Sequence, residues 1–373
     1  MDPLAQARAL RDQQRNREAL GKYAELVAAR PEAGLLAEAA EVALRVDPPT
    51  AAQLAQQALA LDPNHAIAAH HLAEAWARQG RHHDALTLYR RAVGRDGRLA
   101  DLRHPGAKPW TRTDPERGCP SCGGAGEVVF VANATRVQTV FNRLDPIKVW
   151  SRCGGCGLVF TPTVPPGAEL EAYYAAQRGS PAGLTPPDGR AVTQECLAWE
   201  PLLMRLEAAV GGPGRMFEVG SSWGVFLAAA AWRGWDVVGY ELSPPAVAFS
   251  RATFGVRAEA VAIPEALPVW DPPADAAVLW EVLEHFPDPD AALAALASRV
   301  RPGGVVALST PDLDHPAHRA LGWDDPMWCV PGHLVYYDRA TLDAAVRRAG
   351  LTVEQRWFSA RHVGSVGLIA RKG

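Results

Sequence analysis

The chain has 373 residues, of which 48% are hydrophobic, and its 38 basic and 41 acidic side chains leave a net charge of -3. This length predicts two or three separately packed units. The near balance of charge argues against a surface built mainly for nucleic-acid phosphates or anionic lipid, so nucleic acid is not an expected partner. The N-terminus lacks the basic-then-apolar order of a secretion signal, and no apolar run approaches the roughly 20 residues that span a bilayer. We therefore expect a cytoplasmic protein without membrane contact.

Residues 1–100 repeat at a period typical of helical hairpins. The unit HHLAEAWARQGRHHDALTLYRRAVGRDG resembles a tetratricopeptide repeat at its packing positions, which are Leu72, Ala73, Trp76, Ala85, Tyr89 and Ala92. One and two periods upstream the matching positions are Ala39, Val42, Ala51, Ala55, Ala58 and Pro63, and then Ala7, Leu10, Ala19, Tyr23 and Pro31. About three repeats are predicted, because small residues let paired helices approach and Pro ends the second helix. Such a region would bind a protein partner or dimerise; the alternative is a helical cap that only packs on the rest of the chain.

Two stretches without periodicity divide the chain further. RLADLRHPGAKPWTRTDPERG mixes Pro, Gly and both charges, which predicts a linker at 101–118. QRGSPAGLTPPDGR, at 177–190, has the same character. We expect a linker and a helical lead-in over residues 161–200.

Two C-x-x-C pairs lie between these stretches, in CPSCGG and CGGCG. Each pair can turn both thiolates toward one ion, and four sulfurs complete a tetrahedral zinc shell, so the expected ligands are Cys119, Cys122, Cys153 and Cys156. The spacer contains GEVVFVA and IKVWSR, which are β-rich, and residues 119–160 are therefore predicted to be a zinc ribbon. A redox pair is the rival interpretation, but that motif usually occurs once. A closed four-sulfur shell leaves no site for water, so the zinc would be structural. The remaining cysteines, Cys196 and Cys329, are expected to be packing residues.

From residue 201 onward, short β-branched runs alternate with amphipathic helical stretches. This pattern predicts an α/β domain with a mostly parallel sheet that is covered on both faces. The expected strands include 215–219, 235–241, 274–280 and 305–311, with a final antiparallel pair at 351–358 and 363–370. The plan has seven strands, and ligands of such sheets bind beyond the carboxyl ends of the strands.

Two of these strand ends carry candidate ligand-binding residues. The first strand continues into Glu218-Val-Gly220-Ser-Ser-Trp-Gly224 and then a helix, whose N-terminus favours an anionic group such as a carboxylate. The loop has neither the Lys-Ser/Thr of a phosphate-binding loop nor the spacing G-x-G-x-x-G, so phosphate is not expected. The second strand ends on Glu241, where a carboxylate can accept both hydroxyls of a ribose. The pattern predicts recognition of a nucleoside without phosphate.

Four motifs in order, EVGSSWG, VGYELS, LWEVLEHFPDP and RVRPGGVVALSTP, resemble class I S-adenosylmethionine-dependent methyltransferases, in particular the ubiquinone-biosynthesis-like branch. The resemblance covers about residues 200–373 and implies a Rossmann-like domain at 201–373 with S-adenosylmethionine as the methyl donor. By the family's pattern, the glycine loop frames the methionine part and the turn at 260–262 flanks the adenine. That turn departs from the common Asp-containing version. The expected donor-binding residues are Glu218, Gly220, Ser221, Gly224, Glu241, Leu242, Ala260, Val261 and Glu281.

The candidate catalytic bases are His285, in EVLEH, and His333, in PGHLVYYD. His333 ends a long insertion after the fifth strand, and such insertions usually shape the acceptor pocket. Its flat apolar walls would be Trp323, Trp328, Tyr336 and Tyr337, whereas His315 and His318 are weaker candidate bases. The alternative for His333 is a structural histidine that bonds the loop backbone.

A helical EVLEH segment would place Glu281, Glu284 and His285 on one face. This arrangement resembles the E-x-x-E-H that binds a divalent ion in some ubiquinone-pathway and RNA 2′-O-methyltransferases, where a later histidine, here His333, completes the site. In many relatives, however, the run only lines the donor pocket and caps the fourth strand.

The sequence as a whole predicts a methyltransferase that modifies a small-molecule acceptor, chiefly at oxygen of a metabolite, sugar or natural-product intermediate. Two other interpretations stay open. One is a scaffold whose last domain only senses a ligand, and the other is a protein or RNA methyltransferase whose repeats recruit the substrate.

Overall fold

The computed structural model describes residues 2–101, 106–112, 114–136, 143–177, 185–261 and 267–373. The chain divides into two compact units. The first consists of Met1–Asp114, Glu127–Ser151 and Pro326–Pro331, and the second of Pro115–Gly126, Arg152–Asp325 and Gly332–Gly373.

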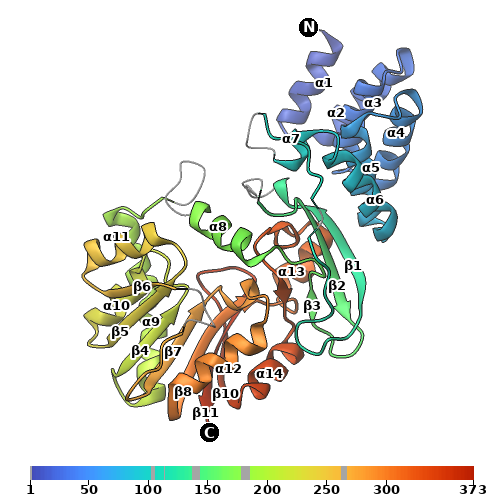
Figure 1. Ribbon diagram of the computed structural model, residues 1–373. Helices are drawn as coiled ribbons and strands as arrows, with labels where there is room; N and C mark the ends of the chain where they lie inside the picture. Colours follow the sequence, from blue (N-terminus) through green and yellow to red (C-terminus); the bar gives the residue numbers. More distant parts are fainter. Residues whose placement is uncertain (1, 102–105, 113, 137–142, 178–184, 262–266) are drawn as a thin grey trace. The chain divides into compact units, whose positions relative to one another are not determined.

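The first unit begins with paired helices (Figure 1). In chain order they are α1 (Pro3–Asp12), α2 (Asn16–Ala29), α3 (Ala33–Ala43), α4 (Pro48–Leu61), α5 (Ala66–Arg78), α6 (His82–Val93) and the short α7 (Gly97–Ala100). Two of them start on an aspartate cap followed by proline: the side chain of Asp2 accepts from the amide of Leu4, and that of Asp47 from Thr50. Such caps satisfy amides that have no partner within the helix, and proline at the first position has no amide to satisfy.

Small side chains fill the core between these helices. Ala19, Ala39, Ala55 and Ala73 have no more than 1% of their surface exposed, and Tyr23 is fully buried among them. Trp76 is only half-buried, and the guanidinium of Arg81 lies 3.8 Å from its ring centroid. The predicted all-α hairpin region is confirmed, and the alanines explain the close approach of its helices.

Strands β1 (Gly126–Asn133) and β2 (Ile147–Cys153), with the 3-10 turns η1 (Ala134–Arg136) and η4 (Pro326–Cys329), complete this unit. The indole of Trp150 donates to the carbonyl of Trp328 at 2.9 Å, and the rings of Phe130 and Trp150 lie 5.7 and 5.9 Å from that of Trp328. Trp328 is 7% exposed. Trp328 thus packs in an aromatic cluster of the first unit, and its place in the wall of an acceptor pocket stays a prediction.

The second unit contains a seven-stranded sheet in the order β10-β11-β8-β7-β4-β5-β6. Its strands are β4 (Arg215–Val219), β5 (Asp236–Glu241), β6 (Arg257–Ala260), β7 (Ala274–Trp280), β8 (Val300–Pro311), β10 (Leu351–Phe358) and β11 (Ser365–Lys372). Strands β6, β5, β4, β7 and β8 run parallel, whereas β11 is antiparallel to both β8 and β10. This confirms the seven-stranded prediction with its final antiparallel pair.

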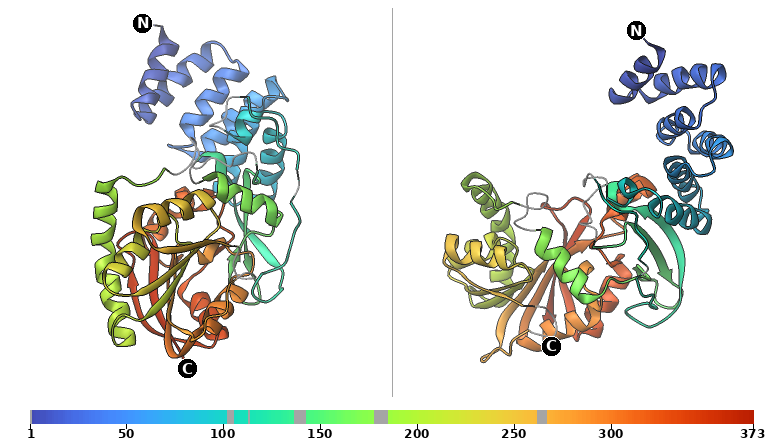
Figure 2. Two further views of the ribbon diagram at one scale, coloured as in Figure 1. Left: turned by 60° about the vertical axis from the view of Figure 1, so that its left-hand side comes forward. Right: turned by 45° about the horizontal axis from the view of Figure 1, so that its top comes forward.

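Helices cover both faces of the sheet (Figures 1 and 2). On one face, α9 (Gly189–Val210) and α10 (Val225–Trp232) pack through Leu203 and Phe226 on Met216. On the other face, α12 (Pro289–Arg299) and α14 (Arg339–Arg348) pack through Leu293 and Leu342 in the core that contains Phe217. Helix α11 (Pro244–Phe254) follows β5. The neighbouring residues Met216 and Phe217 of β4 face opposite sides of the sheet, because side chains along a strand alternate with a two-residue period.

The second unit also contains α8 (Gly167–Gln177), the short strands β3 (Val159–Phe160) and β9 (Val335–Tyr336), α13 (Pro316–Leu321) and the 3-10 turns η2 (Leu283–His285) and η3 (Gly322–Asp324). A helix through EVLEH, the condition for a shared face of Glu281, Glu284 and His285, does not form. Glu281 has a φ of 55°, which ends β7 with a sharp turn and leaves only η2. Tyr337, an expected pocket wall, is 1% exposed within the core. Among the described residues, no helix is long and apolar enough to cross a membrane.

Candidate active site

The glycine loop after β4 depends on two glycines in left-handed backbone conformations. Gly220 has a φ of 72° and Gly224 a φ of 79°. A Cβ atom at Gly220 would lie 2.5 Å from Cγ2 of Val282, and one at Gly224 would meet the hydroxyl of Ser250. The amide of Gly220 donates to the carbonyl of Tyr240 at 2.8 Å, which holds the loop against β5. Both the turn conformation and close packing thus require glycine, in addition to any need for ligand approach.

Glu241 joins this loop to the end of β5. It is 6% exposed, its Oε2 accepts from the amide of Ser222 at 2.8 Å, and its Oε1 accepts from the amide of Ser243 at 3.0 Å. Two backbone donors therefore fix the carboxylate plane. Because each carboxylate oxygen can accept more than one hydrogen bond, this group can also receive hydroxyls from a ligand.

Glu218, near the end of β4, is 3% exposed. Burial and then the negative charge of Glu241 raise its pKa well above the ordinary value, while the positive charge of Arg361 acts in the opposite direction. Its Oε2, like the hydroxyl of the buried Ser221, has no hydrogen-bond partner within the part of the chain that the structure describes. A bound polar ligand would satisfy such atoms.

The other expected donor-binding residues lie around the same strand ends. Leu242 is half-buried after Glu241, Ala260 is exposed at the end of β6, and the amide of Val261 donates to the carbonyl of Glu241 at 3.2 Å. The rest of the expected adenine turn, Ala262, lies outside the described residues. Glu281 follows β7, and its Oε2 accepts from the hydroxyl of Ser365 at 2.7 Å.

Both candidate bases lie together with the carboxylate of Glu284. The Nε2 atoms of His285 and His333 lie 4.0 and 3.9 Å from Oε1 of Glu284, and the two imidazole centroids are 4.6 Å apart. Glu284 is fully buried, and its Oε2 accepts from the hydroxyl of Thr310 at 2.9 Å. Burial and then the charge of Glu281 raise the pKa of Glu284 well above its ordinary value.

Hydrogen bonds orient the two imidazole rings. Nδ1 of His285 lies 2.9 Å from the carbonyl of Gly332 and 2.8 Å from the hydroxyl of Tyr174, a residue of α8. A carbonyl only accepts, so this contact assigns the proton to Nδ1 in the neutral ring and leaves Nε2 as the basic atom. Nδ1 of His333 lies 2.9 Å from the hydroxyl of Tyr336. Tyr174 is a site residue that could not be predicted from the sequence, because Tyr174 lies outside the four motifs and no local pattern marks it.

The weaker candidates have structural contacts. His315 caps α13 by accepting from the amide of Ala317 at 3.1 Å. His318 Nδ1 lies 2.5 Å from Oδ2 of Asp325, and the side chains are 10% and 4% exposed. Trp323, by contrast, is 42% exposed in the same insertion.

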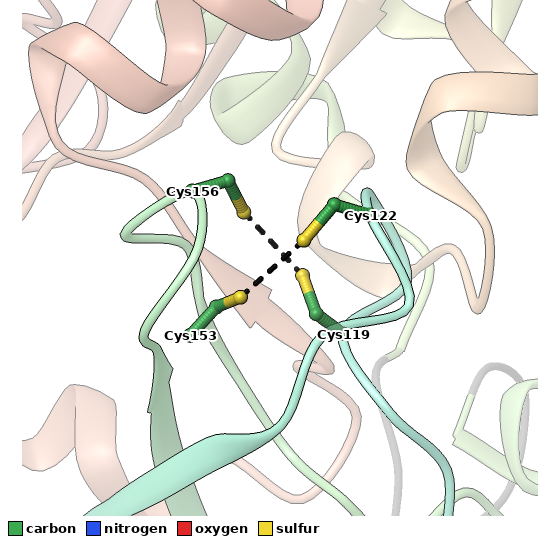
Figure 3. Close-up of side chains that lie close together, drawn as sticks. All are labelled: Cys119, Cys122, Cys153 and Cys156. Atoms are coloured by element: carbon green, nitrogen blue, oxygen red, sulfur yellow. Dashed lines mark hydrogen bonds between the residues drawn. The ribbon is translucent and has the colours of Figure 1, made fainter.

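The four cysteines of the two C-x-x-C pairs converge (Figure 3). Sγ of Cys119 lies 3.5 Å from Sγ of Cys156, Sγ of Cys122 lies 3.4 Å from that of Cys153, and all four lie within 4.8 Å of one another. Zinc–sulfur bonds of about 2.3 Å place tetrahedral sulfurs roughly 3.8 Å apart, so the donor set fits zinc. Matching hydrogen bonds shape both knuckles: the amide of Gly123 donates to the carbonyl of Cys119 at 2.8 Å, and Gly157 to Cys153 at 3.0 Å.

Comparisons with known proteins locate the catalytic segment. Residues 193–356 match the family model described as a methyltransferase domain. The ubiquinone biosynthesis O-methyltransferases of Alkalilimnicola ehrlichii and Bordetella avium are 34% and 35% identical over 101 residues, which is 26% of this chain and 41% and 42% of theirs. The chain therefore spans about two fifths of the length of the curated relatives it matches.

Similar solved structures include two methyltransferases. The first is the 1,6-didemethyltoxoflavin-N1-methyltransferase of Burkholderia thailandensis, solved with 1,6-didemethyltoxoflavin and S-adenosylhomocysteine. It is 22% identical in sequence with a TM-score of 0.43, and the match covers 58% of this chain and 95% of that chain. An amino pentose methyltransferase of Micromonospora echinaspora is 19% identical with a TM-score of 0.39 over 49% and 93%.

Proposed function

We propose that the chain is an S-adenosylmethionine-dependent methyltransferase that methylates oxygen of a small metabolite, sugar or natural-product intermediate. The observation that carries the proposal is the contact between Glu241 and the glycine loop. Its carboxylate accepts from the amides of Ser222 and Ser243, so the ends of β4 and β5 form one nucleoside-binding surface. Such an acidic residue at the end of the second strand is suited to the two hydroxyls of a ribose.

The donor supplies an electrophilic methyl group, and the protein aligns the acceptor with it and takes up the acceptor's proton. His285 and His333 are suited to the second task, because their Nδ1 contacts assign the orientation of each ring and direct Nε2 toward the space beside Glu284. General bases of this kind contribute about 10² to 10⁴-fold to a rate. The matched relatives are O-methyltransferases by name, which favours oxygen as the nucleophile.

For the four cysteines we propose a structural zinc site. Cys119 and Cys153 are 3% and 2% exposed and belong to the same apolar core as the sheet and α14. A closed shell of four thiolates in such a core stabilises the fold and leaves no coordination position for a substrate. The helical hairpins are proposed to be tetratricopeptide-like repeats that bind a protein, which the small-residue packing of α1–α6 supports.

A catalytic divalent ion is a second proposal for the acceptor side. The group that favours it is Glu284, His285 and His333, whose ligand atoms lie within 4.8 Å of one another. Glu281, the fourth residue of the expected ligand set, accepts from the hydroxyl of Ser365 through Oε2. Two histidines and a carboxylate are a common ligand set for divalent metals. Loss of turnover on chelation, while the zinc count and the melting curve stay unchanged, would support this ion.

Calorimetric titration with S-adenosylhomocysteine tests the main proposal. We expect binding by the full chain and, in Glu241→Ala, a loss of affinity of at least about 100-fold, because two hydrogen bonds to a charged group are removed. Glu259→Ala is the matched control, since Glu259 is exposed on the neighbouring strand β6. A folded protein that does not bind, or a Glu241→Ala variant that binds as tightly as the parent, would contradict the proposal.

A further inference from the structure

An arginine outside the four sequence motifs lies in an aromatic cluster at the end of the sheet. Arg361 belongs to the connection between β10 and β11, and its guanidinium carbon lies 3.9 Å from the ring centroid of Trp199 in α9. The Trp199 ring in turn lies 5.0 Å from that of Phe226 and 5.7 Å from that of Trp280. Phe226 is in the first turn of α10, directly after the glycine loop, and Trp280 is the last residue of β7. The cluster therefore borders the strand ends where the donor is expected.

Three N–H donors of this cluster have no hydrogen-bond partner among the described residues. Nε of Arg361 and the indole Nε1 atoms of Trp199 and Trp280 are buried, and none has a hydrogen-bond partner within the described ranges. The two tryptophans are only 7% and 8% exposed. Buried N–H groups without acceptors are rare in native proteins, because they lose their water without compensation. Three such donors on side chains that share the contact residue Trp199 favour a ligand group that only accepts hydrogen bonds, which is the character of a carboxylate.

The charges around Arg361 leave room for such a group. Nη2 of Arg361 lies 3.2 Å from Oε2 of Glu195, a partly exposed residue of α9, so this pair does not occupy Nε. Glu281 lies 3.7 Å from His362 and bonds Ser365. The other acid at these strand ends is Glu218 of β4, whose buried Oε2 has no partner among the residues that the structure describes. A guanidinium donor and a carboxyl acceptor are thus both available at the strand ends, which suits the carboxylate and the ammonium of an amino acid.

We propose that Arg361, stacked on Trp199, binds the carboxylate of the amino-acid part of the methyl donor, and that Glu218 receives its ammonium group. This proposal rests on the proposed function and adds a specificity-determining residue to it. From the sequence, the carboxylate was expected at the N-terminus of α10. Arg361 is consistent with that position, because it stacks on Trp199, and Trp199 contacts Phe226 in the first turn of α10.

Two probes test this assignment in the full chain. S-adenosylhomocysteine carries the amino-acid group, whereas 5′-methylthioadenosine has the same nucleoside and thioether without it. In calorimetric titrations, we expect Arg361→Gln to weaken S-adenosylhomocysteine about 10 to 100-fold, as the loss of a charge-assisted hydrogen bond implies, and to leave methylthioadenosine within about twofold. Arg361→Lys should lose less, because it keeps the charge without the planar fork.

The matched control is Arg205→Gln. Arg205 also lies over a tryptophan, with its guanidinium carbon 5.3 Å from the ring centroid of Trp357, and it belongs to the same helix α9. We expect both probes to bind this variant as they bind the parent. If Arg361→Gln does not fold, Trp199→Phe, which removes one indole donor and keeps an aromatic ring, should show a smaller loss that is again confined to S-adenosylhomocysteine.

The outcomes separate this inference from the proposed function. A parent protein that binds neither probe would contradict the proposed function itself. If the parent binds both probes, equal weakening of the two in Arg361→Gln, or weakening of neither, would overturn the carboxylate assignment. It would also be overturned if Arg361→Gln kept its affinity for S-adenosylhomocysteine and raised only the KM of the acceptor.

Discussion

The donor and acceptor sides of the candidate active site are built in different ways. On the donor side, the key carboxylate, Glu241, is held by backbone amides of the two loops that follow β4 and β5. On the acceptor side, Tyr174, His285 and the segment with His333 and Tyr336 come from three separate parts of the chain. Side-chain contacts and one backbone carbonyl orient these rings. Backbone amides do not titrate and cannot be replaced, whereas imidazole and phenol groups titrate and depend on the segments that carry them. The acceptor side should therefore be the more sensitive to pH, to metal and to distant substitutions.

The acceptor side also shares its support with the cysteine cluster. Strand β3 follows the second C-x-x-C pair and pairs with β9, with Val159 opposite Tyr336 and Phe160 opposite Val335. The amide of Thr161 donates to the carbonyl of Leu334 at 3.0 Å. His333 directly precedes this paired segment, so the position of its ring depends on the fold around the cysteines.

Removal of the proposed zinc should produce the largest effect. Structural zinc contributes about 10–16 kcal/mol of apparent binding free energy, and here two of the proposed ligands, Cys119 and Cys153, lie in the main core of the second unit. We expect Cys153→Ser to abolish the bound zinc and the cooperative calorimetric melting of this unit. Cys196→Ser, which changes a half-buried cysteine of α9 outside the cluster, should keep both. An unaltered melting curve in a metal-free protein would show that the four thiols do not depend on an ion.

Substitution of the histidines should separate the two sides of the site. We expect His285→Gln and His333→Gln each to lower kcat by about 10² to 10⁴-fold, because a general base is lost, without a change in the affinity for S-adenosylhomocysteine. Methyl transfer from labelled donor to a hydroxylated acceptor and calorimetric titration measure the two quantities. His315→Gln is the control, since His315 only caps α13. A loss of donor affinity as large as the loss of kcat would mean that the two sides are one coupled structure.

The same contrast explains what could be predicted from the sequence. Strands 215–219, 274–280 and 351–358 have the predicted bounds, because short runs with β-branched and aromatic residues that end at turns are local signals. For the EVLEH segment, a helix was the condition under which Glu281, Glu284 and His285 would share one face. The left-handed conformation of Glu281, which residue spacing does not encode, rules that condition out. Tyr174 was missed for a related reason: its contact with His285 joins residues 111 positions apart.

The smallest predicted effect is a pH dependence of the insertion that carries α13. His318 contacts Asp325 through Nδ1, and its ring packs against Gly364 of the β10–β11 connection. Burial alone would lower the pKa of His318, but the hydrogen bond and charge of Asp325 outweigh burial, and the pKa is raised. The stabilisation is therefore complete below the ordinary histidine pKa of about 6.5 and is lost as the pH rises through the higher folded value.

Hydrogen-exchange protection factors of residues 316–325, which correct each rate for the intrinsic exchange rate at that pH, measure this loss at pH 6 and pH 9. We expect lower protection at pH 9, by an opening free energy of up to about 1.5–3 kcal/mol, which is the usual worth of a hydrogen bond to a charged group. His318→Gln should remove the difference between the two pH values. His362→Gln should keep it, because the contact of His362 with Glu281 is longer, at 3.7 Å, and its side chain is 46% exposed. Equal protection factors at both pH values in the parent protein would mean that the insertion, like the donor side, is held by contacts that do not titrate.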